Sequence, residues 1–118
     1  MKFLCIVYQD ERIANAMSKA ERQELDNVSL DHDESLRKSG RYIHSNALQF
    51  ADTARTLRLQ NGKVVVTDGP FAETREQVGG YILLEAQDMN EAIQLASTIP
   101  PLRLGGIEIR PVQELKHS

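Results

Sequence analysis

The sequence predicts an α+β domain in which two strand–helix–strand units share one antiparallel sheet, with a β-hairpin inserted between them. Three observations predict this class. Residues 2–8 and 81–86 are apolar at both odd and even positions, which is typical of central strands covered on both faces. Two other segments carry helix-capping spacings. An Asn-Gly pair lies between two alternating segments, which indicates a hairpin.

Length and composition fit a single domain, residues 1–118. The net charge of -3 gives no basic surface for nucleic acid. The apolar run near Met1 is short and ends in Gln9, Asp10 and Glu11, so it indicates a strand and not a signal or membrane segment. Cys5 is the single cysteine, which fits a reducing compartment. We therefore expect a cytoplasmic protein with no nucleic-acid or membrane partner.

The first strand covers residues 2–8 and is followed by a long helix. Ser18-x-x-Glu21 has capping-box spacing and predicts where the helix begins. Gly40 lies where a left-handed residue ends a helix. One stripe of the helix, at steps of three, four and four, consists of Leu25, Val28, His32 and Leu36. This stripe directs His32 towards the core.

A hairpin is predicted after the short strand "RYIH". The segment "TARTLRLQ" alternates apolar and polar side chains and precedes Asn61-Gly62, which favours a two-residue type I′ turn. That turn fixes the register of the two strands, so Leu57 faces Val66. Counting on from this pair, Arg55 faces Asp68.

The connection "VTDGPFAETREQVGGY", residues 66–81, is much longer than the roughly two to five residues that a plain hairpin needs. Connections of this length are often functional. We favour a solvated helical turn around Glu73, Arg75 and Glu76, with Thr74-x-x-Gln77 as its cap. Alternatively, Arg75 grips an anionic substrate or bridges a dimer. Gly79-Gly80 indicates a bulge or a close backbone approach before the next strand.

The second half predicts another strand, helix and strand. Residues 81–86 form a central strand, Asp88-x-x-Glu91 caps the helix, Pro100-Pro101 ends it, and residues 106–112 alternate as a last strand. Right-handed crossovers place both helices on one face, which is the ferredoxin-like split βαβ arrangement with an inserted hairpin. Since the central strands are apolar on the other face too, we expect a homodimer joined through that open face, burying about 1,600 Å² or more.

The run "VTDGPFAETREQVGGYILLEAQDMNEAIQLASTIP", followed by "GGIEIRPV", resembles the DGPF-type branch of the YCII-related family. The likeness extends over nearly the whole chain, including "MKFLCIVYQDE". It implies a ferredoxin-like fold and a dimeric α+β barrel. It also implies a pocket with a paired histidine and aspartate, the feature for which YCII proteins are regarded as candidate enzymes. DGPF-type members are often encoded beside sigma factors of the extracytoplasmic-function class, which implies a regulatory or stress setting.

Residue by residue, Asp68, Gly69, Pro70 and Phe71 match the DGPF signature, and residues 73–76 continue it. Arg75 stands where similar sequences more usually have lysine. His32 lies upstream of Gly40, in the part of the chain where YCII proteins commonly show histidines. His44 occupies a strand position where small residues are frequent in similar sequences.

Each candidate site residue has a structural and a functional interpretation. Asp68 precedes Gly-Pro, and we favour a turn-holding role with Arg55 opposite. In the functional alternative, Asp68 orients a histidine at the rim of a pocket, since a nearby arginine makes it a poor proton acceptor. For His32 and His44 we favour structural roles, with proton transfer as the alternative.

Two functions remain open. The first is a small-molecule-binding protein, or an acid–base enzyme without a cofactor, acting on a small carbonyl or lactone compound. His32 or His44 then transfers the proton and Asp68 orients it, while Arg75 or Arg55 holds a small anionic ligand, and Glu73 is a further substrate-binding candidate. No metal is expected, because "LDHDE" lacks a second spaced histidine. The second is a non-catalytic dimeric interaction or sensing module associated with a sigma-factor regulatory system.

Overall fold

A computed structural model describes residues 1–118 of the protein. Its elements, in chain order, are β1 (Lys2–Asp10), α1 (Glu11–Ala16), α2 (Lys19–Lys38), β2 (Tyr42–Ala47), η1 (Ala51–Thr53), β3 (Arg55–Gln60), β4 (Lys63–Asp68), β5 (Glu76–Glu85), α3 (Met89–Ala96), η2 (Pro100–Leu104) and β6 (Gly105–Pro111). The elements η1 and η2 are short 3₁₀ helices. The order of the longer elements is the predicted one, and α1 is an addition.

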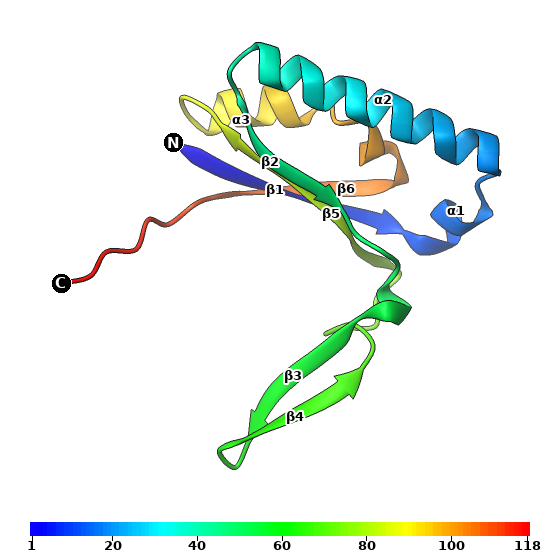
Figure 1. The fold of residues 1–118 in the computed structure, drawn as a ribbon, viewed down its shortest axis with the longest axis vertical. Coiled ribbons are helices and arrows are strands. Elements are labelled where there is room, and N and C mark those ends of the chain that lie inside the picture. Colours follow the sequence, from blue (N-terminus) through cyan, green and yellow to red (C-terminus); the bar gives the residue numbers. More distant parts are fainter.

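The main sheet has the strand order β2-β5-β1-β6, and every neighbouring pair is antiparallel. The runs that are apolar at every position form β1 and β5, the two central strands, as predicted. Helices α2 and α3 lie on the same face of this sheet (Figure 1). The chain is therefore an α+β fold with the ferredoxin-like features that the sequence predicts.

The helices begin at the predicted capping residues. Ser18 and Glu21 form the reciprocal capping box, with the Glu21 amide donating to Ser18 Oγ at 3.0 Å and the Ser18 amide donating to Glu21 Oε1 at 2.9 Å. Asp88 accepts from the Glu91 amide at 2.9 Å. Gly40, just past α2, has a φ of 77°, the left-handed conformation in which glycine carries no steric cost.

The core lies between the sheet and the two helices. From β1 and β5 it takes Phe3, Cys5, Val7, Ile82 and Leu84, and from the covering segments it takes Leu36, Ala92, Ala96 and Ile99. Burial raises the pKa of the Cys5 thiol to about 11. Cys5 is therefore a core side chain.

The hairpin β3–β4 is a separate two-stranded sheet that projects away from the main body (Figure 1). Asn61 and Gly62 have φ values of 52° and 77°, as a type I′ turn requires. The predicted register is confirmed, with Leu57 opposite Val66 and Arg55 opposite Asp68. One face of the hairpin, which we call the hairpin's apolar face, consists of Leu57, Leu59, Val64 and Val66, each at least 60% exposed.

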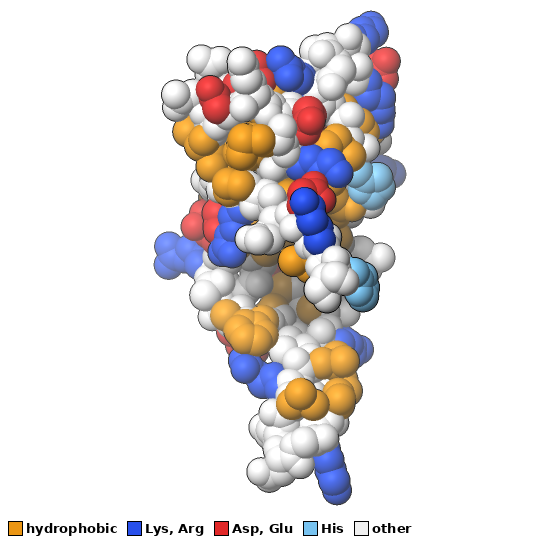
Figure 2. Space-filling view, turned by 90° about the vertical axis from the view of Figure 1, so that its left-hand side faces the viewer, with side chains coloured by type: hydrophobic (Ala, Val, Ile, Leu, Met, Phe, Trp, Pro, Cys, Tyr) orange, Lys and Arg blue, Asp and Glu red, His pale blue; other side chains and the backbone are white.

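The chain exposes more surface than a compact molecule of its mass. Its accessible surface is 8459 Å², whereas a compact chain of this mass exposes about 6,450 Å². Its radius of gyration is 16.2 Å, against about 13.5 Å for a compact domain of this length. Figure 2 shows apolar side chains both on the body and on the projecting hairpin, with a hollow between them. Both sheets are open in one chain, so the closed barrel that the resemblance implies is not formed by the chain alone.

The connection before β5 differs from the prediction. No helical turn forms around Glu73, Arg75 and Glu76, because β5 begins at Glu76 and is already extended there. Gln77 is not a helix cap: its Nε2 donates to the carbonyl oxygens of Ala72 at 2.8 Å and Thr74 at 2.9 Å. The loop is thus held by one amide side chain instead of by helical backbone bonds.

The bulge at the Gly79-Gly80 pair is confirmed. Val7 pairs with Gly80 and Tyr8 with Val78, which leaves Gly79 as the extra residue in β5. A Cβ at Gly80 would lie 2.8 Å from the Asn46 carbonyl oxygen, so the close approach of β2 requires glycine there.

Candidate functional site

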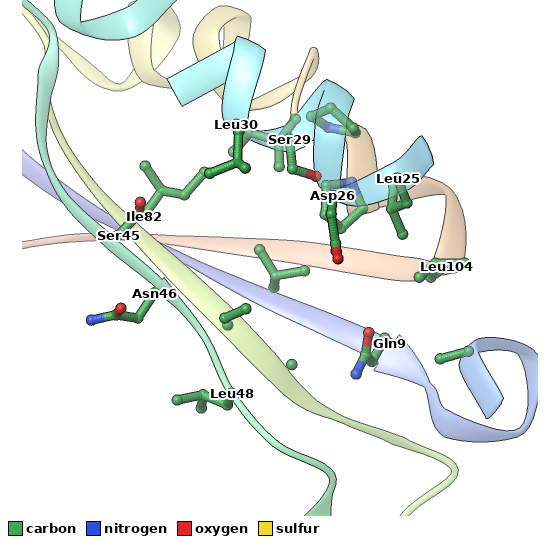
Figure 3. A pocket seen from close by; sticks show the side chains of 18 of the residues that line it. Gln9, Leu25, Asp26, Ser29, Leu30, Ser45, Asn46, Leu48, Ile82 and Leu104 are labelled. Carbon is green, nitrogen blue, oxygen red and sulfur yellow. The ribbon is translucent and has the colours of Figure 1, made fainter. Parts of the chain in front are cut away.

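A cavity of about 530 Å³ lies between α2 and the strands β1, β2 and β5 (Figure 3). Ligand sites in proteins have volumes of roughly 300–1,000 Å³. We call this space the α2 cavity. Its apolar lining includes Val7, Leu25, Leu30, Ile82, Ile99 and Leu104, and its polar lining includes Gln9, Arg22, Asp26, Ser29, His32, Asp33 and Ser45.

The spacing of residues along α2 gives the cavity its polar wall. Asp26, Ser29 and Asp33 follow one another at steps of three and four, so their side chains leave the helix on one side. Buried Leu25 and Leu36 anchor the helix on either side of this stretch. In Figure 3 the Asp26 side chain extends from α2 towards the sheet.

The contacts of His32 favour one proton position. Its Nε2 lies 2.9 Å from Thr98 Oγ1, and Thr98 Oγ1 lies 3.0 Å from the Leu95 carbonyl oxygen, which can only accept. A proton on Nε2 satisfies both contacts, because the Thr98 hydroxyl then accepts from the ring and donates to Leu95, and we assign this tautomer. In the neutral ring Nδ1 then carries the lone pair, and this atom is buried without a hydrogen-bond partner.

Burial of the ring lowers the pKa of His32 below its ordinary value of 6.5, and the charge of neighbouring Asp33 opposes that shift in part. At neutral pH the ring is therefore uncharged and able to take up a proton. The available position is Nδ1, because Nε2 already carries one. Such an arrangement suits a general base better than a structural cation.

Asp33 joins α2 to β2 along one wall of the cavity. Its Oδ2 accepts from the Ser45 hydroxyl at 3.0 Å, and Tyr42 Oη lies 2.7 Å from Ser45 Oγ. The guanidinium of Arg37 stacks over the Tyr42 ring at 4.2 Å. Asp33 is therefore fixed in place, whereas Asp26 has neither a hydrogen bond nor an ion pair within the chain.

Asp68 lies at the end of β4, outside the α2 cavity. Its Oδ1 is 3.1 Å from Arg55 Nε, and its side chain is 88% exposed. The predicted Arg55–Asp68 contact is therefore present. Within one chain Asp68 shares no hydrogen bond with His32 or His44. The carboxylates that share a cavity with His32 are Asp26 and Asp33.

His44 lies on the opposite face of the sheet from the helices. Its partners in the neighbouring strand follow from the register, in which His44 stands beside Leu83 and Asn46 beside Tyr81. His44 Nδ1 is 2.7 Å from Tyr81 Oη, and Asn46 Nδ2 donates to that same Oη at 3.2 Å. His44 is thus part of an exposed polar cluster on the open face, separate from His32.

Glu73 and Arg75 line a second, shallower hollow of about 630 Å³, together with Glu11, Arg12, Asp52, Gly69, Pro70 and Gln77. Arg12 is held by Asp10 through bonds of 3.4 and 3.3 Å. The structure therefore places Glu73 and Arg75 on one surface beside α1. Neither residue shares a site with His32 or His44. No three His, Cys, Asp or Glu side chains lie close enough together to hold a metal ion.

The prediction from sequence missed Asp26, Ser29, Asp33 and Ser45. A signal for the first three was present, since they accompany His32 along one side of the predicted helix. Charged residues on a helix usually indicate a solvated face, so this spacing alone does not predict a site. Ser45 had no comparable signal, because its contact with Asp33 depends on how β2 lies against α2.

These features define a small α+β domain with a ligand-sized cavity between its sheet and its long helix. Residues 1–116 match the YCII-related domain, and the chain belongs to that family. An uncharacterized protein of Rhizobium meliloti (strain 1021) is 32% identical over 117 residues, which cover 95% of this chain and 92% of the relative. The resemblance seen in the sequence is thereby confirmed at the level of the family. None of the helices has the length and apolar character needed to cross a membrane.

Proposed function

We propose that the α2 cavity binds a small organic molecule and that His32 exchanges a proton with it without the help of a cofactor. One observation carries this proposal. The contact with Thr98 is best satisfied with the His32 proton at Nε2, and Nδ1 is then an unpartnered lone pair that is covered from solvent. Buried polar atoms without a partner are uncommon and costly in folded proteins, so we propose that a shift of the ring or of its neighbours brings Nδ1 to the ligand.

The cavity residues have complementary roles in this chemistry. Once a shift of the ring or of its neighbours uncovers it, His32 Nδ1 accepts a proton from a carbon next to a carbonyl or from a hydroxyl group, and returns it at another position. Asp33, on the same helix, favours the imidazolium that forms, since its charge raises the pKa of His32. Small carbonyl or lactone compounds suit such a reaction, and this substrate class rests on analogy with similar folds.

In this proposal Asp33 takes the role that the sequence suggested for Asp68. Of the residues with a predicted site role, only His32 lines the α2 cavity. His44, Arg55, Asp68, Glu73 and Arg75 lie outside it in the same chain, so a direct part for them in proton transfer requires a second copy. We also propose that the chain belongs to the DGPF-type branch of the family, on the basis of Asp68, Gly69, Pro70 and Phe71. A cytoplasmic regulatory setting is a further part of this proposal.

A thermal-shift screen with small carbonyl compounds, lactones, phenols and amines tests the proposed function. His32→Gln keeps a side-chain amide that is able to donate to Thr98 but removes the base. His44→Gln is the matched control, because it makes the same change outside the cavity. Compounds that stabilise the wild type and the His44 variant but not the His32 variant support the proposal. Stabilisation that survives in the His32 variant and is lost in the His44 variant contradicts it.

We also propose that a second copy of the chain covers the open sheet face and the hairpin's apolar face. The open face has an apolar centre formed by Leu4, Ile6, Tyr8, Tyr81 and Leu83. The chain exposes about 2,000 Å² more than a compact molecule of its mass, and an obligate dimer buries about that much from each chain. The second function, a non-catalytic dimeric interaction or sensing module associated with a sigma-factor regulatory system, is compatible with the same pairing of copies.

A further inference from the structure

We infer that the ligand of the α2 cavity is a small molecule with an apolar body and a hydrogen-bond donor, an amine or a hydroxyl group, and that carboxylates are excluded. This inference rests on the proposed function of the cavity and names its ligand class. It differs from the small anionic ligand that Arg55 and Arg75 suggested in the sequence, since neither arginine lines this cavity.

The acidic side chains of the cavity wall offer acceptors that lack donors. Asp26 is exposed and has no donor within the chain. Asp33 uses Oδ2 for the Ser45 hydroxyl, which leaves Oδ1 available. An ionised carboxylate is purely an acceptor, whereas Gln9 and Ser29 in the same lining can either donate or accept. A ligand that bonds to the two carboxylates must therefore bring protons on nitrogen or oxygen.

The one cation in the lining does not offset this surplus. Arg22 Nη2 donates to the Ala14 carbonyl oxygen at 2.6 Å, and its guanidinium lies over the Phe50 ring at 5.4 Å from the centroid. Arg22 is thus engaged with α1 and with the segment after β2. With His32 uncharged, two carboxylates and one arginine leave the lining with one net negative charge, which disfavours an anion in a partly enclosed site.

The rest of the cavity defines the body of the ligand. Val7, Leu25, Ile82, Ile99 and Leu104 contribute apolar side chains to the lining, and all five are buried. A volume of about 530 Å³ accommodates a ring or a short branched chain. Apolar contacts supply most of the affinity in such pockets, while a few placed polar groups fix orientation. A ligand with an apolar body and one donor group therefore matches both the apolar and the polar lining of the cavity.

Three probes of similar size separate these properties: benzylamine, benzyl alcohol and benzoate. Each is titrated into uniformly ¹⁵N-labelled protein at millimolar concentration, and the amide shifts are followed. We expect benzylamine and benzyl alcohol to shift Gln9, Ser29, Ser45 and Ile82, and benzoate to leave them in place. Asp26→Asn is expected to raise the dissociation constant of benzylamine about tenfold, because a charge-assisted hydrogen bond is lost. The dissociation constant of benzyl alcohol should change by no more than about twofold.

Asp31→Asn is the matched control, because Asp31 is an acid on the same helix, exposed like Asp26, that does not line the cavity. It is expected to leave both dissociation constants unchanged. If benzoate shifts the amide signals of the cavity residues and benzylamine does not, the proposed ligand class is wrong. The cavity would then bind carboxylates in preference to amines. The ligand class is also wrong if Asp26→Asn leaves benzylamine binding unchanged. If none of the three probes shifts a cavity residue, both the ligand class and the proposed function are overturned.

Discussion

His32 Nε2 lies 2.9 Å from Thr98 Oγ1, so a hydroxyl just beyond α3 is the hydrogen-bond partner of the imidazole on α2. The Thr98 hydroxyl has only one proton and lies 3.0 Å from the Leu95 carbonyl oxygen; both bonds are made when the ring carries its proton on Nε2, which is the tautomer that we assign. This contact between α2 and the segment after α3 therefore influences which nitrogen of the His32 ring is protonated. Thr98 is accordingly a positioning residue for His32.

Replacing Thr98 by valine is expected to remove the preference of His32 for the Nε2–H form. The ¹⁵N shifts of the ring, measured in two-bond correlation spectra, should move towards a tautomer mixture, and Thr98→Ser should restore the wild-type pattern. The free energy of unfolding should fall by about 1 kcal/mol, the typical net value of one hydrogen bond.

Ser97→Ala is the control for Thr98→Val. It removes a similar hydroxyl bond, from Ser97 Oγ to the Ile93 carbonyl oxygen, without touching His32. A comparable loss of stability with unchanged ring shifts is expected. If Thr98→Val leaves the ring shifts as they are in the wild type, Thr98 does not set the tautomer.

Stability should depend on pH through His32. Burial lowers the pKa of His32 in the folded protein below 6.5, so the unfolded chain binds a proton first as the pH falls. The contribution of His32 is therefore complete above about pH 6.5 and is lost progressively below it, until the folded pKa is reached. Hydrogen bonds from Arg12 and Arg110 are the main cause of the lowered carboxyl pKa values of Asp10 and Glu108. These two groups therefore affect the pH dependence of stability only at more acidic pH than His32 does.

Urea unfolding midpoints between about pH 5 and pH 8 provide the measurement. His32→Gln should flatten the curve in this window, whereas His44→Gln should keep the slope that His32 produces. A wild-type midpoint that is constant over the window, or a slope that remains in the His32 variant, would contradict the assignment.

The hairpin's apolar face should hold the proposed dimer together. Leu57→Ser combined with Val66→Thr changes two directly paired side chains that are exposed in the single chain, so the fold of the chain should persist. The dissociation constant should rise about tenfold or more, because each large side chain contributes about 1.5–3 kcal/mol when it is fully buried. Light scattering after size exclusion gives the mass at several concentrations.

Val65→Thr is the control for the hairpin variant, since Val65 pairs with Arg58 on the other face of the hairpin. It should leave the dimer unchanged. A wild-type protein that remains monomeric at high concentration would refute the proposed pairing of copies, as would a Leu57/Val66 variant that dimerises as strongly as the wild type.

Asp68→Asn should have a small effect on stability. The Arg55–Asp68 pair is present, but the carboxylate is 88% exposed, and exposed ion pairs contribute less than about 1 kcal/mol. Thermal unfolding of the variant should therefore resemble that of the wild type, and binding in the α2 cavity should persist. A loss of about 1–3 kcal/mol would instead show that Asp68 holds the turn before Gly69-Pro70.

Much of the fold was predictable because it depends on local chemistry. The Asn61-Gly62 turn needs two positive φ values, and this requirement alone fixes the pairing of Leu57 with Val66. Capping by Ser18 and Asp88 is equally local. The loop before β5 was predicted wrongly because the Gln77 side chain competes for the carbonyl oxygens of Ala72 and Thr74, and spacing alone does not reveal that competition.

The site was less predictable than the fold. The connection at residues 66–81 is long and charged, yet its charged residues Asp68, Glu73 and Arg75 lie on the hairpin and in the hollow beside α1. Only its last three residues, 79–81, line the α2 cavity. The α2 cavity is assembled from side chains of several elements distant in sequence. The state of His32 depends on Thr98, 66 residues away, and no local pattern carries such a contact.

The location of the ligand site is decided by mapping amide shift changes for the strongest compound from the thermal-shift screen. Binding in the α2 cavity predicts changes at Gln9, Ser29, Ser45 and Ile82, together with a change at the His32 ring. Changes confined to residues 69–77, around Glu73 and Arg75, would place the site in the hollow beside α1 and contradict the assignment of His32 as the proton acceptor.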